Sequence, residues 1–230
     1  MEDSKLTRRA IVQMALIVIL VPMLPLLISW QWDWWEAWVY AFLSIGGFVV
    51  SRVLAGRKNP GQLAERAKGL MHQDAEEWDR KLAPIAGLGG SVIPIAAGLD
   101  AVFGWSASIS LPVRLVGLAL MLIGYFISTY ALVENSFFSG MVRLQKERGH
   151  HVIDTGPYAW VRHPGYAGAL LLYIGVPLLL NSWWSYLPFA LWMIPLVIRT
   201  SKEDQFLQEK LEGYKEFTRK TKYRLFPGIW

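Results

Sequence analysis

The sequence contains no cysteine, and only four of its 230 residues are histidine. The absence of cysteine excludes disulfide bonds, thiolate nucleophiles and cysteine-ligated metal sites. Polar residues are scarce too, since 53% of the chain is hydrophobic and the mean hydropathy is +0.30. That composition is too apolar for an ordinary soluble domain. The net charge of +5 would suit nucleic-acid binding, but its distribution along the chain favours a membrane protein that binds no nucleic acid.

Two familiar binding motifs are also missing. His150 and His151 are adjacent, so on an extended chain their side chains point in opposite directions. No cluster of carboxylates and histidines with zinc spacing accompanies them, and we expect no metal. The glycines at 87, 89, 90 and 98 follow no predicted strand, which excludes a dinucleotide-binding glycine loop. They suit close helix packing instead.

Long apolar runs dominate what is present. They cover residues 10–30, 38–54, 82–103, 111–133 and 166–198. Each of the first four can cross ~30 Å of hydrocarbon as a helix. The fifth would measure ~50 Å as one helix, and Asn181-Ser182 before two tryptophans marks an interfacial turn. We therefore predict an all-α integral membrane protein with about five to six transmembrane helices, the last two forming a short hairpin.

The segments between and after these runs have patterns of their own. No small-residue cleavage site follows the run at 10–30, which we interpret as a retained span rather than a signal peptide. In the charged segment 52–81, Leu63, Ala67, Leu70 and Met71 recur at helical spacing, which predicts a helix on the membrane surface; His72 is interpreted as a solvated residue. The tail predicts a C-terminal amphipathic helix with one apolar face formed by Phe206, Leu207, Leu211, Tyr214 and Phe217.

The positive charges fix an orientation for this layout. With a cytoplasmic N-terminus, all but one of the 23 lysines and arginines fall in segments on the cytoplasmic side, and Arg114 is the exception. This asymmetry follows the positive-inside rule. It predicts that both termini are cytoplasmic, on the same side as residues 134–165 and the tail from Arg199.

Residues 150–168 form the polar interruption best suited to chemistry. Pro157 and Pro164 each adjoin a glycine, which predicts two turns. The turns bring together the side chains of His150, His151, Tyr158, Trp160, Arg162, His163 and Tyr166. A loop at a membrane surface would also contain turn residues and aromatic anchors, so composition alone leaves both interpretations open.

The motifs decide between them. Gly156-Pro157-Tyr158 and Arg162-His163-Pro164, followed by Tyr166 and Gly168, resemble the S-adenosylmethionine-binding core of the isoprenylcysteine carboxyl methyltransferase family, which is related to membrane phospholipid methyltransferases. The resemblance covers roughly residues 135–228. Its further matches are Asn135, Phe138, Arg143, Gln145, His150, Arg199, Glu203, Leu207, Gly213-Tyr214 and Arg224-Leu225-Phe226-Pro227.

The resemblance implies a cofactor, S-adenosyl-L-methionine, in a pocket facing the cytoplasm. The cofactor-binding residues that it implies are Gln145, His150, His151, Val152, Ile153, Tyr158, His163, Pro164, Gly165, Tyr166 and Glu203. Arg199 and Glu203 are the implied catalytic residues. Arg199 would also bind the acceptor, whose carboxylate a guanidinium can grip with two prongs. We expect one membrane methyltransferase domain over 1–230, with four spans in 1–133 and the cofactor-binding core in 134–230.

The methyl acceptor stays open at this point. A prenylcysteine carboxylate, a phospholipid amine, a small thiol or another lipophilic molecule would all fit, in contact with membrane lipids. A base is needed only for a protonated amine or thiol, and His163 or Glu203 could serve. Without the resemblance, Arg199 and Glu203 form an ordinary ion pair four residues apart. The alternative functions are an NADPH-dependent sterol-type reductase, with a phosphate site at 215–224, and a non-catalytic membrane scaffold.

Overall fold

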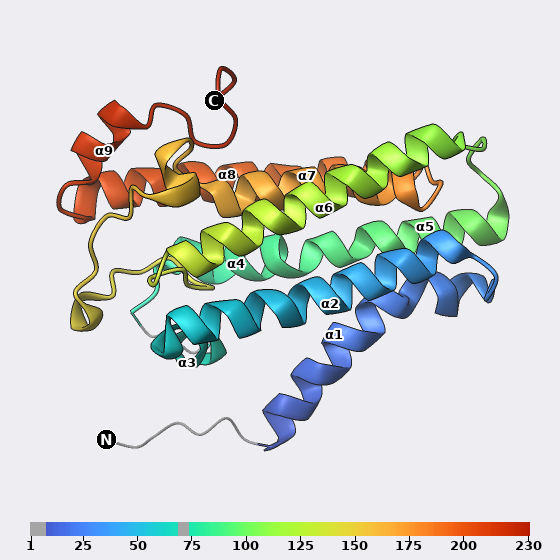
Figure 1. Ribbon diagram of the computed structural model, residues 1–230, viewed down its shortest axis with the longest axis horizontal. Coiled ribbons are helices and arrows are strands. Elements are labelled where there is room, and N and C mark those ends of the chain that lie inside the picture. Colours follow the sequence, from blue (N-terminus) through green and yellow to red (C-terminus); the bar gives the residue numbers. More distant parts are fainter. Residues whose placement is uncertain (1–7, 69–73) are drawn as a thin grey trace.

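Helices are the only regular elements in residues 8–68 and 74–230, the part of the chain that the computed structural model describes (Figure 1). This confirms the all-α class. Six helices run roughly along the long axis of the molecule: α2 (Trp35–Lys58), α4 (Glu77–Leu88), α5 (Val92–Phe103), α6 (Leu111–Glu134), α7 (Pro164–Leu179) and α8 (Tyr186–Lys210). The first helix, α1 (Arg8–Ser29), is oblique to them. The short helices are α3 (Pro60–Lys68), η2 (Gly89–Ser91), η3 (Lys146–Arg148), η4 (Gly156–Ala159) and α9 (Tyr214–Lys220).

Three helical stretches within the described residues are long and apolar enough to cross a membrane: Trp35–Lys58, Glu77–Phe103 and Leu111–Glu134. The second joins α4, η2 and α5, and it begins before the predicted start at Leu82. Ala15–Ser29 and Pro164–Leu179 are shorter apolar helices. Large apolar side chains such as Phe42, Phe126 and Leu191 are exposed on the helix surfaces, as a hydrocarbon environment requires. The protein is therefore built for a membrane, and the six-span layout stays a prediction.

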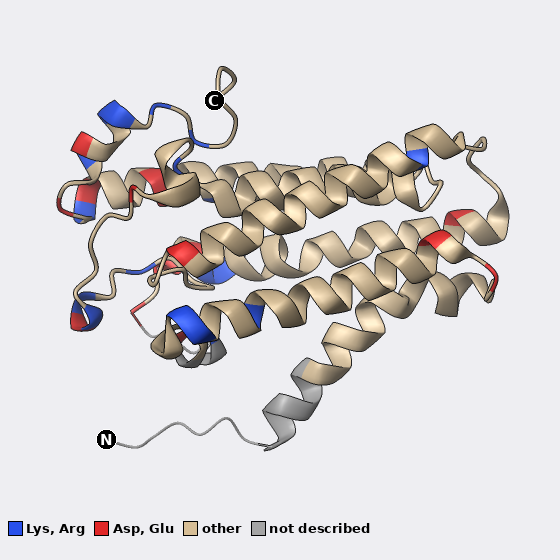
Figure 2. Cartoon of the chain, viewed as in Figure 1, with Lys and Arg blue, Asp and Glu red and all other residues tan. Residues whose placement is uncertain are grey.

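Charged residues gather at the two ends of the helices (Figure 2). One end contains α3, η3 and α9 with most of the lysines and arginines. The opposite end contains Asp100 and the ion pair of the half-buried Arg114 with the buried Glu36. This separation agrees with the predicted division of the charges, while the side that faces the cytoplasm stays a prediction.

Glycines set the closest contact between helices, at the crossing of α6 and α7. A methyl group on Gly124 would lie 2.5 Å from the carbonyl oxygen of Gly168, and one on Gly117 would lie 2.7 Å from the backbone nitrogen of Leu179. The two backbones therefore touch, which only small residues permit. Among the glycines noted from the sequence, those at 89, 90 and 98 also face close neighbours, and Gly87 faces open space.

Residues 166–198 do not form one helix. The chain leaves α7 at Leu179, takes a positive φ of 56° at Asn181, and enters α8 at Tyr186. The break falls at the predicted Asn181-Ser182 turn. The predicted C-terminal amphipathic helix is divided in two, because Phe206 and Leu207 belong to α8, which continues to Lys210, whereas Tyr214 and Phe217 belong to α9. Gly213, with a positive φ of 79°, turns the chain between α8 and α9, and Tyr214 and Phe217 of α9 are buried.

The cytoplasmic-side segment predicted at 52–81 is also divided differently. Its first residues continue α2 to Lys58, and α3 follows after Asn59. Gln62 is fully buried and donates to the carbonyl oxygens of Leu132 (3.0 Å) and Asn135 (2.5 Å). The helix α3 is therefore fixed on the end of α6. Leu70, Met71 and His72 lie outside the described residues.

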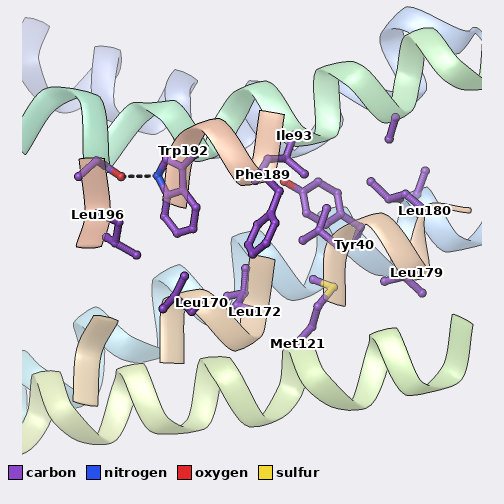
Figure 3. Close-up of a cluster of buried hydrophobic side chains, with 14 of the residues drawn as sticks. Tyr40, Ile93, Met121, Leu170, Leu172, Leu179, Leu180, Phe189, Trp192 and Leu196 are labelled. Atoms are coloured by element: carbon purple, nitrogen blue, oxygen red, sulfur yellow. Dashed lines mark hydrogen bonds between the residues drawn. The ribbon is translucent and has the colours of Figure 1, made fainter. Parts of the chain in front are cut away.

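A buried apolar cluster joins the helices (Figure 3). Trp192 of α8 donates from its indole nitrogen to the carbonyl oxygen of Ala86 in α4 at 2.8 Å, and its ring lies 4.6 Å from that of Tyr173. Ile93, Met121, Leu179 and Phe189 belong to the same buried cluster. This cluster aligns α4, α7 and α8, the three helices that position the polar residues described next.

Candidate functional site

A cavity of about 640 Å³ runs from the polar end of the molecule into the helices. Its polar end is lined by Arg143, His150, Arg162, His163, Tyr166, Arg199 and Glu203. Its apolar part lies between α1, α2, α4, α6, α7 and α8, against Val21, Tyr40, Gly47, Tyr125, Leu172 and Trp192. Polar and apolar ligand parts could thus lie in one continuous space.

Two backbone hydrogen bonds position the Arg162-His163-Pro164 turn. The amides of Arg162 and His163 donate to the carbonyl oxygens of Tyr223 and Arg224, each at 2.9 Å. Pro164 then opens α7, where its missing N–H costs nothing. The C-terminal segment therefore lies beside the turn and holds His163 at the mouth of the cavity.

Asp204 is the centre of the polar contacts around this turn, and it is fully buried. Its carboxylate accepts two hydrogen bonds from Arg162, at 2.7 and 3.0 Å, and one from Arg224 at 2.9 Å. Gln208 and Tyr214 donate to it at 2.9 and 3.2 Å, and His163 Nε2 lies 3.3 Å away. Asp204 therefore ties α8, the turn and the C-terminal segment together.

The protonation of Asp204 follows from these partners. Burial alone would raise the pKa of its carboxyl group, but the hydrogen bonds from His163, Arg162 and Arg224 outweigh burial and hold the pKa well below its usual range. Asp204 is therefore an anion at every physiological pH. All three nitrogens of the Arg162 guanidinium have partners, because Nη1 donates to the carbonyl oxygens of Thr221 and Lys222.

A second polar chain crosses the cavity from α4 to α8. Arg199 donates from Nε and Nη2 to the two carboxylate oxygens of Asp79, at 2.7 and 3.0 Å. Its Nη1 donates to the Tyr166 hydroxyl, which in turn donates to Glu203 at 2.6 Å. The Tyr166 hydroxyl therefore links Arg199 to Glu203 by hydrogen bonds. The edge of the guanidinium formed by Nε and Nη2, which could bind a carboxylate in bidentate fashion, is occupied by Asp79.

His150 lies against the ring of Phe137, with centroids 4.5 Å apart. Burial, followed by the neighbouring His151, Arg143 and Arg148, lowers the pKa of His150 to about 4. The imidazole is therefore neutral at pH 7 and presents a flat, uncharged ring beside the cavity. His151 is exposed, with Nδ1 at 3.0 Å from the carbonyl oxygen of Gly149.

The structure brings ten of the predicted site residues to the cavity: His150, His151, Val152, Ile153, Tyr158, His163, Gly165, Tyr166, Arg199 and Glu203. Two are elsewhere. Gln145 is buried and donates to the carbonyl oxygen of Phe137 at 2.7 Å, while Pro164 is buried at the start of α7. Within the described residues, no group of three or more histidines and carboxylates is arranged to hold a metal ion.

Sequence analysis missed the two fully buried carboxylates at the site, Asp79 and Asp204. Asp79 stands in a charged run, Glu76–Arg80, that is typical of a solvated surface. Asp204 had a usable signal: it falls four residues after Thr200 and eight after Leu196, on the buried stripe of α8. A carboxylate on such a stripe needs cationic partners, because an unpaired buried charge is costly.

Comparison with known proteins supports the relationship inferred from the motifs. The phospholipid methyltransferase family model matches residues 113–213. A probable protein-S-isoprenylcysteine O-methyltransferase from Oryza sativa subsp. indica is 30% identical over 111 residues, which are 47% of this chain and 58% of the relative. The protein-S-isoprenylcysteine O-methyltransferase of Saccharomyces cerevisiae is 38% identical over 66 residues, 28% of each chain.

A third relative, the protein-S-isoprenylcysteine O-methyltransferase of Schizosaccharomyces pombe, is 27% identical over 106 residues, 45% of each chain. The chain thus spans between about a quarter and three fifths of the length of these relatives. The matches confirm the resemblance to membrane methyltransferases of the isoprenylcysteine and phospholipid type. The family match over residues 113–213 includes His150, His163, Tyr166, Arg199 and Glu203, which line the polar end of the cavity.

Proposed function

We propose that this protein is an integral membrane methyltransferase that transfers a methyl group from S-adenosyl-L-methionine to a lipophilic acceptor. The observation that carries the proposal is the cavity, in which the polar residues of the family motifs open into an apolar space between helices. A water-soluble donor could enter the polar end while an acceptor with a long apolar chain occupies the rest. The phospholipid methyltransferase match over 113–213 supports the reaction class.

The residues present fit such a donor. Glu203 lines the cavity with a carboxylate for an ammonium group, and one of its oxygens accepts from Tyr166. The rings of His163 and Tyr166 lie stacked with centroids 5.9 Å apart, and Tyr158 is close by, so a flat base has aromatic walls. The donor supplies a methyl group on a positively charged sulfur, which leaves with the electron pair of the broken bond.

The chain's own residues would act mainly by orientation. Arg199 is held in place by Asp79, Gly140 and Tyr166. Two of the five N–H groups of Arg199 donate to Asp79, one to Gly140 and one to Tyr166. At most one N–H group therefore remains for an acceptor atom. Methyl transfer requires the acceptor atom, the methyl carbon and the sulfur in line, so fixed groups and exclusion of water favour the reaction. A carboxylate acceptor would need no base.

The location of the site supports an orientation toward the cytoplasm. The polar end of the cavity coincides with the end of the helices that contains most lysines and arginines (Figure 2). By the positive-inside rule this end faces the cytoplasm, as do both termini. The donor would then enter directly from that compartment.

Calorimetric binding to the purified protein in detergent tests the proposal. S-adenosylhomocysteine, the demethylated donor, should bind, and NADPH should not. Glu203→Gln should weaken S-adenosylhomocysteine binding at least tenfold, because a charge-assisted contact is lost. Glu209→Gln, an exposed position on the same helix, is the matched control. Binding of NADPH alone would replace the proposal with a reductase, and binding of neither in lipid nanodiscs would favour a scaffold.

A further inference from the structure

Two arginines in the wall of the cavity have no carboxylate partner within the described residues. Arg52 of α2 donates to Ser51 Oγ at 3.2 Å, and its guanidinium lies 4.5 Å from the centroid of the Phe48 ring. Arg66 of α3 lies 5.2 Å from the ring centroid of Phe138 and makes one long contact, 3.4 Å, with that residue's carbonyl oxygen. Both line the cavity.

The other arginines of the cavity are all paired. Arg143 contacts Glu65, Asp74 and Glu147; Arg162 contacts Asp204; and Arg199 contacts Asp79. Arg52 and Arg66 therefore add two uncompensated positive charges to this space. Burial, and then the nearby guanidinium of Arg52, lower the pKa of Arg66 to about 9. The positive charge of Arg52 therefore acts on Arg66, and an anion bound beside both groups would offset it.

We propose that Arg52 and Arg66 form a subsite for the anionic group of the methyl acceptor, a carboxylate or a phosphate, with its apolar chain between α1, α2, α6 and α7. This inference rests on the proposed function. Arg199 supports the inference as well, because its Nε and Nη2 already donate to Asp79 and cannot form a bidentate contact with the acceptor. The guanidinium groups of Arg52 and Arg66 still have N–H donors in the planar arrangement that binds a carboxylate or a phosphate through two hydrogen bonds.

The position of the pair assigns it to the acceptor rather than to the donor. The residues expected to contact the donor lie between 145 and 203, in the loop and on α7 and α8. Arg52 and Arg66 come from α2 and α3, outside the residues 113–213 that match the phospholipid methyltransferase family. Arg52 lies over the ring of Phe48, which also lines the cavity. Arg66 interacts electrostatically with Tyr166 and Arg199, so an anion held beside it, either the reacting carboxylate itself or a phosphate next to the reacting group, would lie near both residues.

Paired probes that differ only in charge test the subsite. We would measure binding of an S-prenylated N-acetylcysteine and of its methyl ester, and of a lysophosphatidate and its neutral monoacylglycerol, to the full chain in nanodiscs. The wild type should prefer the anion of at least one pair by tenfold or more, and the preferred pair identifies carboxylate or phosphate as the anion. Arg52→Gln and Arg66→Gln should each reduce that preference at least fivefold.

The controls separate a charge effect from misfolding. Arg52→Lys and Arg66→Lys keep the charge and should keep part of the preference, while Arg57→Gln, on the exposed side of α2, should keep all of it. Affinity for S-adenosylhomocysteine should stay within twofold in every variant. Equal affinity for both members of both pairs in the wild type, or a preference unchanged in both Gln variants, overturns the subsite. The donor measurement reports separately on the proposed function, so either can fail alone.

Discussion

Arg199 and Asp79 lie 120 residues apart in the sequence and meet through two parallel hydrogen bonds, at 2.7 and 3.0 Å. Asp79 is fully buried and Arg199 nearly so. The pair joins α4 to α8, and its Arg199 lines the cavity. It therefore fixes the guanidinium that we propose lies nearest the methyl acceptor, and makes α4 part of the proposed site.

Asp79→Asn should destabilise the protein by about 3–5 kcal/mol, because it leaves the charge of Arg199 buried without a partner. Unfolding by denaturant in detergent, followed by tryptophan fluorescence, would measure the change. Glu77→Gln, at an exposed position of the same helix, should change the stability by less than ~0.5 kcal/mol. Equal stabilities of Asp79→Asn and Glu77→Gln would contradict the importance of the pair.

Tyr166→Phe removes the hydroxyl that links Arg199 to Glu203 and leaves the aromatic ring. Small misplacements of reacting groups can cost about 100-fold in rate, and we expect the methyl-transfer kcat to fall about 10- to 100-fold. Binding of S-adenosylhomocysteine should change less than threefold, because the ring still walls the cavity. A labelled methyl donor and the acceptor found above would give kcat and KM. Loss of donor binding with unchanged kcat would show that the hydroxyl acts differently.

Asp204→Asn should release the C-terminal segment. The carboxylate accepts from Arg162, Arg224, Gln208 and Tyr214, and an amide cannot serve all of these donors. Limited proteolysis should cut residues 211–230 at least tenfold faster than in the wild type. Asp204 also has a lowered pKa, so its contribution to stability is present above pH ~4 and is lost as the pH falls below that value. Unchanged protection of the tail would refute this role.

Gly124→Ala should destabilise the α6–α7 contact by about 1–3 kcal/mol, because the new methyl group would lie 2.5 Å from the carbonyl oxygen of Gly168. Gly87→Ala is the matched control in α4, since its methyl group would meet nothing within 4 Å. It should be neutral or slightly stabilising, because alanine restricts the unfolded chain. Thermal unfolding in detergent would compare them, and identical midpoints would contradict the close packing.

His150 should make stability depend on pH in mildly acidic solution. Its pKa is about 4 in the folded protein and ~6.5 in an unfolded chain. Between these values the unfolded chain binds the proton first, so the free energy of unfolding falls as the pH falls from about 6.5 toward 4. His150→Gln should flatten this part of the curve. Parallel curves for wild type and variant would disprove the assignment.

Much of the fold was predictable because hydropathy and turn residues act locally. The spans at 38–54 and 111–133 became α2 and α6 with small changes at their ends, and the Asn181-Ser182 turn separates α7 from α8. The predicted bounds of the tail helix were wrong because α8 remains helical while its buried face changes from apolar residues to Arg199, Thr200 and Asp204. A change of polarity looks like a boundary in the sequence, although these residues find buried partners.

The sequence alone determined the apolar segments, the distribution of charge between the two ends and the motifs that place this chain near membrane methyltransferases. These depend on each residue's own preference for water or hydrocarbon and on its neighbours in the chain. The tertiary structure decided which charges are paired: Asp79 with Arg199, Asp204 with Arg162, and no acid with Arg52 or Arg66 within the described residues. The energy of a buried charge depends on the groups within a few ångströms, and these come from helices far apart in the sequence.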